Sequence, residues 1–256
     1  MAETKQLGAV LLVAGAALAF WSFGDRNSTD HHQLSEKITT VELAADSADI
    51  TIAASDDDKT TVQVKRKYWL WKHGDAYSVD NGTLKLDGDC GWQCSADLAV
   101  TVPRGTKVIG HNGSGDISIA GVSGVDAKST SGEIDISDMT GDVKLDLTSG
   151  DVKVNNLTGR LDVKATSGDI EAADLKGGPV NVESTSGDLE LELADANDVR
   201  AKGTSGDIHV TAPAGDYNVS TETRSGEAEN GLGDDPNGAH TILATTTSGD
   251  IDLLSR

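Results

Sequence analysis

The chain has 256 residues with 42 acidic and 21 basic side chains, a formal net charge of −21 and a pI near 4.4. A chain this acidic is repelled by phosphate backbones and by anionic lipid surfaces, which argues against nucleic acids and acidic membrane surfaces as partners. Its length fits one extended domain with appendages. Few aromatic residues and many charges would also fit disorder, but the alternation of apolar and polar residues described below predicts an all-β protein.

Residues 1–24 contain an apolar run, Leu7–Phe23, of 17 residues without a charge. That is about the shortest length that spans a membrane as a helix. Ala17-Leu18-Ala19 also fits the small-residue site at which a signal peptide is cleaved. We favour an uncleaved transmembrane anchor in the cytoplasmic membrane, with a secreted or periplasmic protein after cleavage as the alternative. Both predict that the rest of the chain is extracytoplasmic.

Residues 25–37 are polar and predict a linker. Its pair His31-His32 has no further ligand at metal-site spacing, so no metal is predicted there. Residues 38–103 show short stretches of strand alternation separated by turns, which predicts irregular N-terminal coils.

The most unusual local chemistry is the basic aromatic stretch, Lys65–His73 (KRKYWLWKH). If the strand phase set by Val62 and Val64 continues, Lys65, Lys67, Trp69 and Trp71 share the outer face. Exposed tryptophans mark contact surfaces that stack on sugar rings, dock a partner or lie against lipid headgroups. The alternative is a hairpin in which the next segment covers both. The candidate binding surface comprises Lys65, Lys67, Trp69, Trp71 and Trp92.

Cys90 and Cys94 are the only cysteines and flank Trp92. In an exported chain two cysteines predict a disulfide, which would pin a local bulge. A redox or zinc site is less favoured, because the spacing is CxxxC and no second cysteine pair exists.

Residues 104–256 repeat one phrase, Ser-Gly-Asp/Glu followed by a mostly apolar residue. The phrase begins at Ser114, Ser131, Ser149, Ser167, Ser186, Ser205, Ser225 and Ser248, with spacings of 17, 18, 18, 19, 19, 20 and 23 residues. Within each repeat two short period-two stretches are separated by turns, so each unit predicts two strands. Stacking such units buries their apolar faces, which predicts a β-solenoid or β-helix of coils of 18–20 residues. An antiparallel β-sandwich is the competing fold; handedness does not follow from the pattern.

The acid of each phrase is expected to accept hydrogen bonds from nearby amides in the turn. A ladder of stacked acids that binds cations is the less favoured alternative, because the dense Gly/Asp nonapeptide of calcium-binding solenoids is missing. A degenerate ninth phrase lies at Ser47-Ala48-Asp49-Ile50. Towards the C-terminus, residues 229–238 predict a loop, and the chain stops halfway round a coil. Strand edges there are either capped by that loop or open to end-to-end self-association.

The repeated TSGDI units, the apolar N-terminal segment and the sequence DLAVTVPRG at residues 97–105 resemble a bacterial β-strand-repeat family of unknown function whose members are called "putative adhesins". The similarity extends over residues 38–254. It implies an exported or membrane-tethered β-solenoid of the cell envelope.

Three functions are open at this point. The favoured one is a non-enzymatic, membrane-tethered envelope solenoid that acts as an adhesion, scaffold or sensing surface. The second is a module that binds a glycan or an envelope protein through the basic aromatic stretch. The third is a carbohydrate-active β-helix enzyme, which needs a specific pair of carboxylates, whereas acids here occur at every turn. No cofactor and no catalytic residue are predicted.

Overall fold

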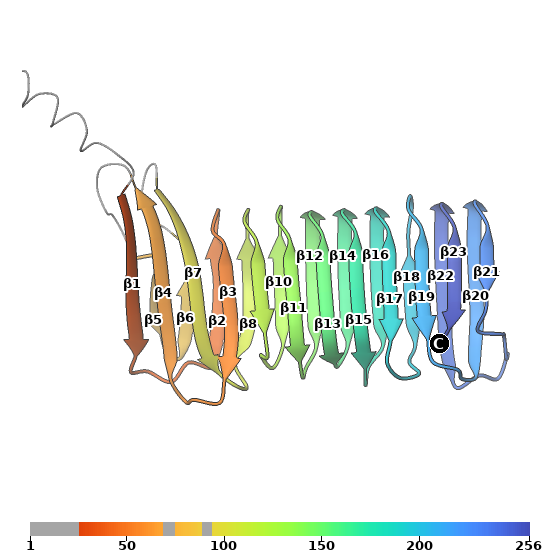
Figure 1. Cartoon of the computed structure of the whole chain (residues 1–256), viewed down its shortest axis with the longest axis horizontal. Coiled ribbons are helices and arrows are strands. Elements are labelled where there is room, and N and C mark those ends of the chain that lie inside the picture. Colours follow the sequence, from red (N-terminus) through yellow and green to blue (C-terminus); the bar gives the residue numbers. More distant parts are fainter. Residues whose placement is uncertain (1–25, 69–74, 89–93) are drawn as a thin grey trace, which may run out of the picture.

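A computed structural model describes residues 26–68, 75–88 and 94–256. The described residues form 23 strands and no helix, arranged as a rod of stacked coils (Figure 1). None of them belongs to a helix that is long and apolar enough to span a membrane. The apolar run at residues 7–23, for which we expect an anchor or a signal peptide, lies outside the described residues.

The regular coils each contribute one strand to each of two parallel sheets, as the period-two pattern predicts. The first sheet has twelve strands and the second has eleven. In the regular part the first sheet contains β9 (Ile117–Ala120), β11 (Ile134–Met139), β13 (Val152–Thr158), β15 (Ile170–Lys176), β17 (Leu189–Leu193) and β19 (Ile208–Ala212). The second contains β8 (Lys107–Asn112), β10 (Val125–Ser129), β12 (Val143–Ser149), β14 (Leu161–Ser167), β16 (Val180–Ser186) and β18 (Val199–Lys202).

The core lies between the two sheets and is made of in-register rows of aliphatic side chains. Ile134, Val152, Ile170 and Leu189 are register partners on consecutive strands of the first sheet, and all are buried. A single coil cannot shield such a row from water, so the coils stabilise one another by stacking. The predicted all-β solenoid fold is confirmed.

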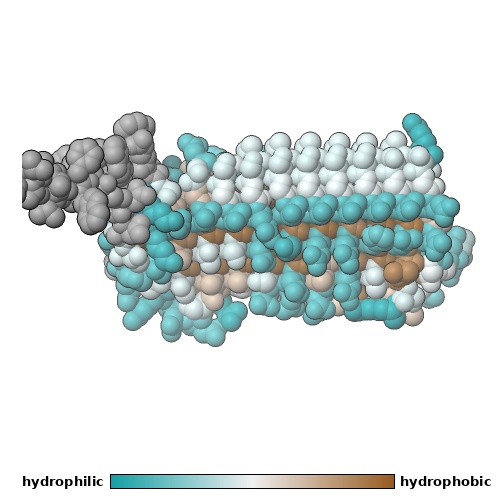
Figure 2. All heavy atoms as spheres, turned by 45° about the horizontal axis from the view of Figure 1, so that its top comes forward, coloured by the Kyte–Doolittle hydropathy of each residue, from teal (hydrophilic) through white to brown (hydrophobic). Residues whose placement is uncertain are grey.

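The Ser-Gly-Asp phrases stack at one edge of the rod, in the turns where the chain passes from a strand of the second sheet to a strand of the first. Each glycine has a positive φ, and a Cβ there would meet the backbone of the preceding coil; at Gly187 it would lie 2.1 Å from the carbonyl oxygen of Gly168. Only glycine permits both the conformation and this approach. Figure 2 brings these turns forward and shows bands of uniform hydropathy along the rod.

The acids of the phrases form a directional hydrogen-bond ladder. The backbone N–H of Asp188 donates to Oδ1 of Asp169 at 2.9 Å, and the N–H of Asp207 donates to Oδ1 of Asp188 at 2.8 Å. The same bond joins Asp116 to Asp49 of the degenerate phrase. The predicted role as amide acceptor is therefore confirmed, and the acceptor serves the next coil rather than its own turn.

The N-terminal coils stack out of chain order. β2 (Thr40–Ala45) and β3 (Ile50–Ser55) lie between the β8–β9 coil and a coil made of β6 (Thr83–Leu86) and β7 (Cys94–Pro103). β4 (Thr60–Tyr68) then runs antiparallel beside β7, and β5 (Tyr77–Asp80) forms a hairpin with β6.

The C-terminal coils are also out of order. β22 (His240–Ser248) and β23 (Ile251–Ser255) insert between the β18–β19 coil and the outermost coil of β20 (Tyr217–Ser225) and β21 (Ala228–Asn230). The end of the chain is therefore internal to the stack and is not its edge. The glycine-rich loop that follows β21 covers part of the β20 edge, because the N–H of Val219 donates to Oδ1 of Asp234 at 3.1 Å.

Strand β1 (Arg26–Leu34) corrects the linker predicted over residues 25–37. It pairs antiparallel with β4 over nine residues and forms the N-terminal edge of the first sheet. Its polar side chains give no clear period-two pattern, because an edge strand is held mainly by backbone hydrogen bonds to one neighbour.

Candidate functional site

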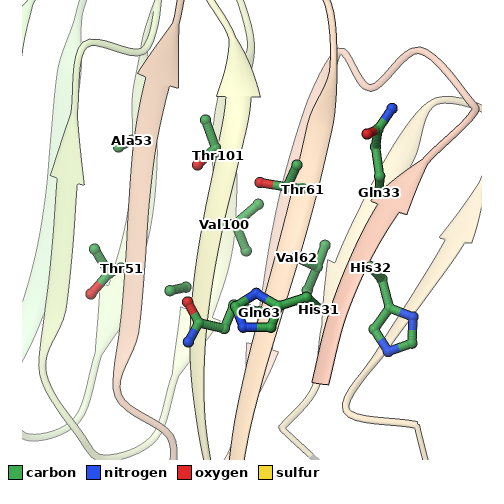
Figure 3. Close-up of a pocket in the computed structure, with 11 residues that line it drawn as sticks. His31, His32, Gln33, Thr51, Ala53, Thr61, Val62, Gln63, Val100 and Thr101 are labelled. Carbon is green, nitrogen blue, oxygen red and sulfur yellow. The ribbon is translucent and has the colours of Figure 1, made fainter. Parts of the chain in front are cut away.

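A groove lies on the outer face of the first sheet at its N-terminal end, across β1, β4, β7 and β3. Its volume is about 400 Å³. Figure 3 shows polar side chains from these strands around it. The lining residues are His31, His32, Gln33, Thr51, Ala53, Thr61, Val62, Gln63, Ala99, Val100 and Thr101. We call this the N-terminal groove.

The groove exists because small outward side chains lie between longer ones. Ala53 and Ala99 contribute only a methyl group, whereas Gln63 on the neighbouring β4 extends further. Its lining contains amide, hydroxyl and imidazole groups but no Asp, Glu, Lys or Arg. Such a surface can both donate and accept hydrogen bonds while carrying little charge.

The groove continues towards Lys65 and Asp97. A second hollow shares Thr51, Gln63 and Ala99 with it and is also lined by Asp49, Lys65, Asp97 and Leu98. Lys65 and Lys67 are exposed, while Val62 and Val64 are buried, so β4 has the predicted strand phase. Trp69, Trp71, Trp92 and Cys90 lie outside the described residues, and the predicted disulfide with Cys94 stays a prediction.

The strands that form the groove also pair at their far ends, beyond its lining residues. Arg26 is the register partner of Tyr68, and Tyr68 is the register partner of Cys94. The described part of the basic aromatic stretch therefore lies beside the first residues of β1, and Cys94 lies on the other side of β4. The sequence pattern does not predict that Arg26, Tyr68 and Cys94 are neighbours, because this depends on the antiparallel pairing of β1 with β4.

A polar cluster closes the N-terminal end of the core on the inner face of the same strands. Arg66 is 4% exposed and donates from a guanidinium nitrogen to Oδ2 of Asp30 at 2.6 Å. The rings of His32 and Tyr77 lie 5.8 Å apart. Partial burial raises the pKa of the Tyr77 hydroxyl, and the nearby carboxylate of Asp75 adds to the effect.

The two adjacent histidines face opposite sides of β1. His31 pairs in register with the outward Gln63, whereas His32 pairs with the buried Val62, and its ring lies tilted beside that of Tyr77. They cannot ligate one metal ion together. Among the residues that the structure describes, no three His, Cys, Asp or Glu side chains converge as metal ligands.

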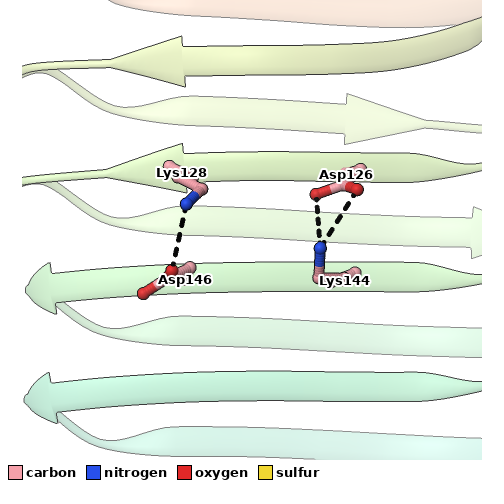
Figure 4. A network of polar contacts seen from close by, with 4 residues as sticks. All are labelled: Asp126, Lys128, Lys144 and Asp146. Atoms are coloured by element: carbon pink, nitrogen blue, oxygen red, sulfur yellow. Dashed lines mark hydrogen bonds and ion pairs between the residues drawn. The ribbon is translucent and has the colours of Figure 1, made fainter.

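The outer face of the second sheet carries charges whose sign alternates from coil to coil. Lys144 lies 3.2 Å from Asp126, and Lys128 lies 3.4 Å from Asp146 (Figure 4). In-register parallel pairing places equivalent positions side by side, so equal charges would repel each other. Each exposed pair contributes at most about 1 kcal/mol, so the pairs add only modestly to the register that the core rows impose.

Several solved structures of bacterial proteins match the chain. A "putative adhesin" from Bacteroides fragilis NCTC 9343 aligns with a TM-score of 0.58 and 17% identity, over 90% of this chain and 97% of that one. A "putative adhesin" from Parabacteroides merdae ATCC 43184 aligns at 0.39 with 9% identity, over 90% and 96% of the two chains. A "putative cell adhesion protein" from Clostridium sporogenes ATCC 15579 aligns at 0.31 with 12% identity, over 90% and 100%.

No functionally curated protein matches the chain. The Bacteroides fragilis structure shares the fold, and at 17% identity the likeness extends no further. A family model described as Toastrack DUF4097 matches residues 38–254, which covers every coil of the solenoid from β2 almost to the end of β23. The chain therefore belongs to the Toastrack DUF4097 family.

Proposed function

We propose that this protein is an exported, non-enzymatic module of the cell envelope that makes adhesion-type contacts through the surface of its solenoid. The observation that carries the proposal is the N-terminal groove, which is open and lined with uncharged hydrogen-bonding groups. Its lining has no carboxylate, so it lacks the pair of carboxylates on which most glycoside hydrolases depend. The names of the structural neighbours are in keeping with a contact function.

The same proposal includes a membrane tether formed by residues 1–24. Their apolar run precedes β1, which is the outermost strand of the first sheet at the N-terminal end. A tether there would hold the N-terminal groove near the membrane and project the later coils away from it (Figure 1). Lys65 and Lys67, exposed at that end, would then lie close to lipid headgroups or to material bound at the membrane surface.

A glycan is the second candidate, and a specific observation favours it. The N-terminal groove adjoins the hollow lined by Lys65, which is the first residue of the basic aromatic stretch that in sequence contains Trp69 and Trp71. Amide and hydroxyl groups bind sugar hydroxyls, and tryptophan rings stack on sugar faces. A neutral or weakly charged cell-envelope glycan therefore fits the groove better than an anionic polymer does.

The binding test uses the full-length protein and insoluble cell-wall glycan in a pull-down assay. We expect Gln63→Ala, and separately Trp69→Ala combined with Trp71→Ala, to weaken retention by about tenfold or more. Lys164→Ala, on the outer face of the second sheet, is the matched control and should retain wild-type binding. Equal retention of all variants would reject the N-terminal groove as the contact surface.

The tether is tested by cell fractionation followed by N-terminal sequencing of the mature protein. We expect the protein in the membrane fraction with the apolar run intact. A soluble extracytoplasmic protein that begins shortly after Ala19 would show that the run is a cleaved signal peptide instead.

A further inference from the structure

A second hollow lies on the outer face of the second sheet, far along the rod from the N-terminal groove. It occupies about 430 Å³ where β14, β16, β18 and β22 begin. Arg160 and Arg200 line it together with Pro179, Leu243, the backbone of the inward-facing Val180 and Val199, and the polar residues Asp162, Asn181, Asp198 and Thr241. We call it the arginine cleft.

The two arginines lack carboxylate partners because two ladders stop at the cleft. On the outward row, the alternation of charges ends at Asn181, and Arg200 has Asn181 on one side and Leu243 on the other. Neither neighbour is charged. Within the described part of the chain Arg200 forms no ion pair, although the protein has twice as many acids as bases.

The second interruption is at Pro179. At the turn that precedes the strands of the second sheet, two coils carry an aspartate that accepts an N–H of the next coil: the N–H of Arg160 donates to Oδ1 of Asp142 at 3.0 Å, and the N–H of Thr241 donates to Oδ1 of Asp198 at 2.9 Å. Pro179 has no N–H to donate. A carboxylate at position 160 would therefore have no N–H of the next coil to accept, and position 160 is an arginine.

The carboxylates in the cleft already have protein partners. Oδ1 of Asp162 accepts the amide of Asn181 at 3.1 Å, and Oδ1 of Asp198 accepts the N–H of Thr241 and lies 3.7 Å from Nδ1 of His240. The guanidinium groups of Arg160 and Arg200 have donors left over, because neither forms an ion pair within the described residues. The cleft therefore has unused donors, and Pro179 and Leu243 add apolar surface beside them.

We propose that the arginine cleft binds a carboxylated sugar, a uronic acid residue of an acidic glycan. Guanidinium groups bind carboxylates with paired, charge-assisted hydrogen bonds. The remaining oxygens of Asp162 and Asp198, with the hydroxyl of Thr241, can bind sugar hydroxyls, and Pro179 and Leu243 can pack against the ring. Arg160 lies just before β14 and Arg200 is the second residue of β18, two coils further along, so their backbones are roughly 10 Å apart or slightly more, a spacing that a sugar-sized ligand bridges. This site is independent of the N-terminal groove and of its proposed ligand.

The test is calorimetric titration of the full-length protein with glucuronate at low ionic strength, with glucose as the neutral counterpart and acetyl-alanine as a non-sugar carboxylate. We expect glucuronate to bind in the micromolar to millimolar range and at least about tenfold more tightly than either. Amide chemical shifts should move at Val180 and Val199, beside the cleft, and stay unchanged at Thr61 in the N-terminal groove.

Arg160→Gln and Arg200→Gln should each weaken glucuronate binding by about tenfold or more. Both side chains are exposed, so the fold should tolerate the changes. Lys164→Gln removes one positive charge from the same sheet face outside the cleft lining and should leave binding unchanged. No binding of glucuronate, equal affinity for glucose, or an equal loss in the Lys164 variant would overturn the proposal; tighter binding of acetyl-alanine would overturn the assignment to a sugar.

Discussion

The stacked glycines make the sharpest prediction about how this solenoid holds together. Gly168 has a φ of +122°, and an alanine Cβ there would lie 2.1 Å from the carbonyl oxygen of Gly150. Cβ atoms essentially never approach closer than 3.0 Å, so the two coils would have to separate locally by about 0.9 Å, the difference between these distances. Gly168→Ala should therefore pull the β14–β15 coil away from the coil before it.

The cost follows from the bonds at that point. Two bonds join this turn to the coil before it: the N–H of Val152 donates to the carbonyl of Asp169 at 2.9 Å, and the N–H of Asp169 donates to Oδ1 of Asp151 at 3.0 Å. Losing or stretching two or three such bonds costs about 1 kcal/mol each. Placing alanine at positive φ adds about 1–2 kcal/mol. We expect Gly168→Ala to lower the free energy of unfolding by about 3–5 kcal/mol.

Gly105→Ala is the matched control, because Gly105 also has a positive φ, +89°, but a Cβ there meets nothing within 4 Å. Gly105→Ala should lower the free energy of unfolding only by the strain of a positive φ. The lower entropy of the unfolded chain offsets part of that strain, so the net loss should be about 1 kcal/mol. Urea unfolding followed by circular dichroism measures both. With a slope of about 3 kcal/mol per molar urea, the two midpoints should differ by about 1 M. Equal midpoints would refute the argument that coil contact, and not φ alone, requires glycine.

Two further changes probe the ends of the rod. Asp30→Ala leaves the buried guanidinium of Arg66 without its carboxylate and should lower the free energy of unfolding in urea by about 3 kcal/mol. The double variant Asp30→Ala with Arg66→Met should regain most of that loss. An Asp30→Ala variant as stable as the wild type would contradict the argument. Tyr217, 1% exposed, donates its hydroxyl to a backbone carbonyl, so Tyr217→Phe should cost about 1 kcal/mol at pH 7. Burial, with a further contribution from Asp195, raises the Tyr217 pKa, so this tyrosine's stabilising effect is complete below pH 10.0 and declines as pH rises from there through the raised value. The deficit of the Phe variant should then shrink in unfolding experiments above pH 10; a pH-independent deficit would argue against the shift.

The regular coils illustrate how much of the fold local pattern specifies. Alternation at Val152, Val154, Leu161 and Val163 gives two strands with inward aliphatic side chains, and both appear as predicted. The turns follow for the same reason: a glycine that needs positive φ and an aspartate that accepts an amide are local requirements repeated at a fixed period.

The candidate sites were less accessible to sequence reasoning. The outward phase of Lys65 and Lys67 follows from alternation and is confirmed. The N-terminal groove depends on β1 pairing beside β4, and β1 has a polar sequence that resembles a linker. The arginine cleft was missed because Arg160 and Arg200 are forty residues apart and neither carries a motif. The signal that could have revealed it is the break in charge alternation at Asn181, which becomes visible once the repeats are aligned.

The sequence by itself determined the repeating coil, the inward and outward sides of each strand and the chemistry of the stacked turns, because all three follow from periodicity and local backbone requirements. Only the tertiary structure decided which coil lies beside which. Equivalent coils present nearly the same edge to any neighbour, so the period alone does not fix the stacking order. It does not predict that the β2–β3 coil stacks between β6–β7 and β8–β9, or that the β22–β23 coil stacks between β18–β19 and β20–β21. That order depends on the lengths and turns of the connecting segments, and it sets where the polar edge strand β1 and the two clefts lie.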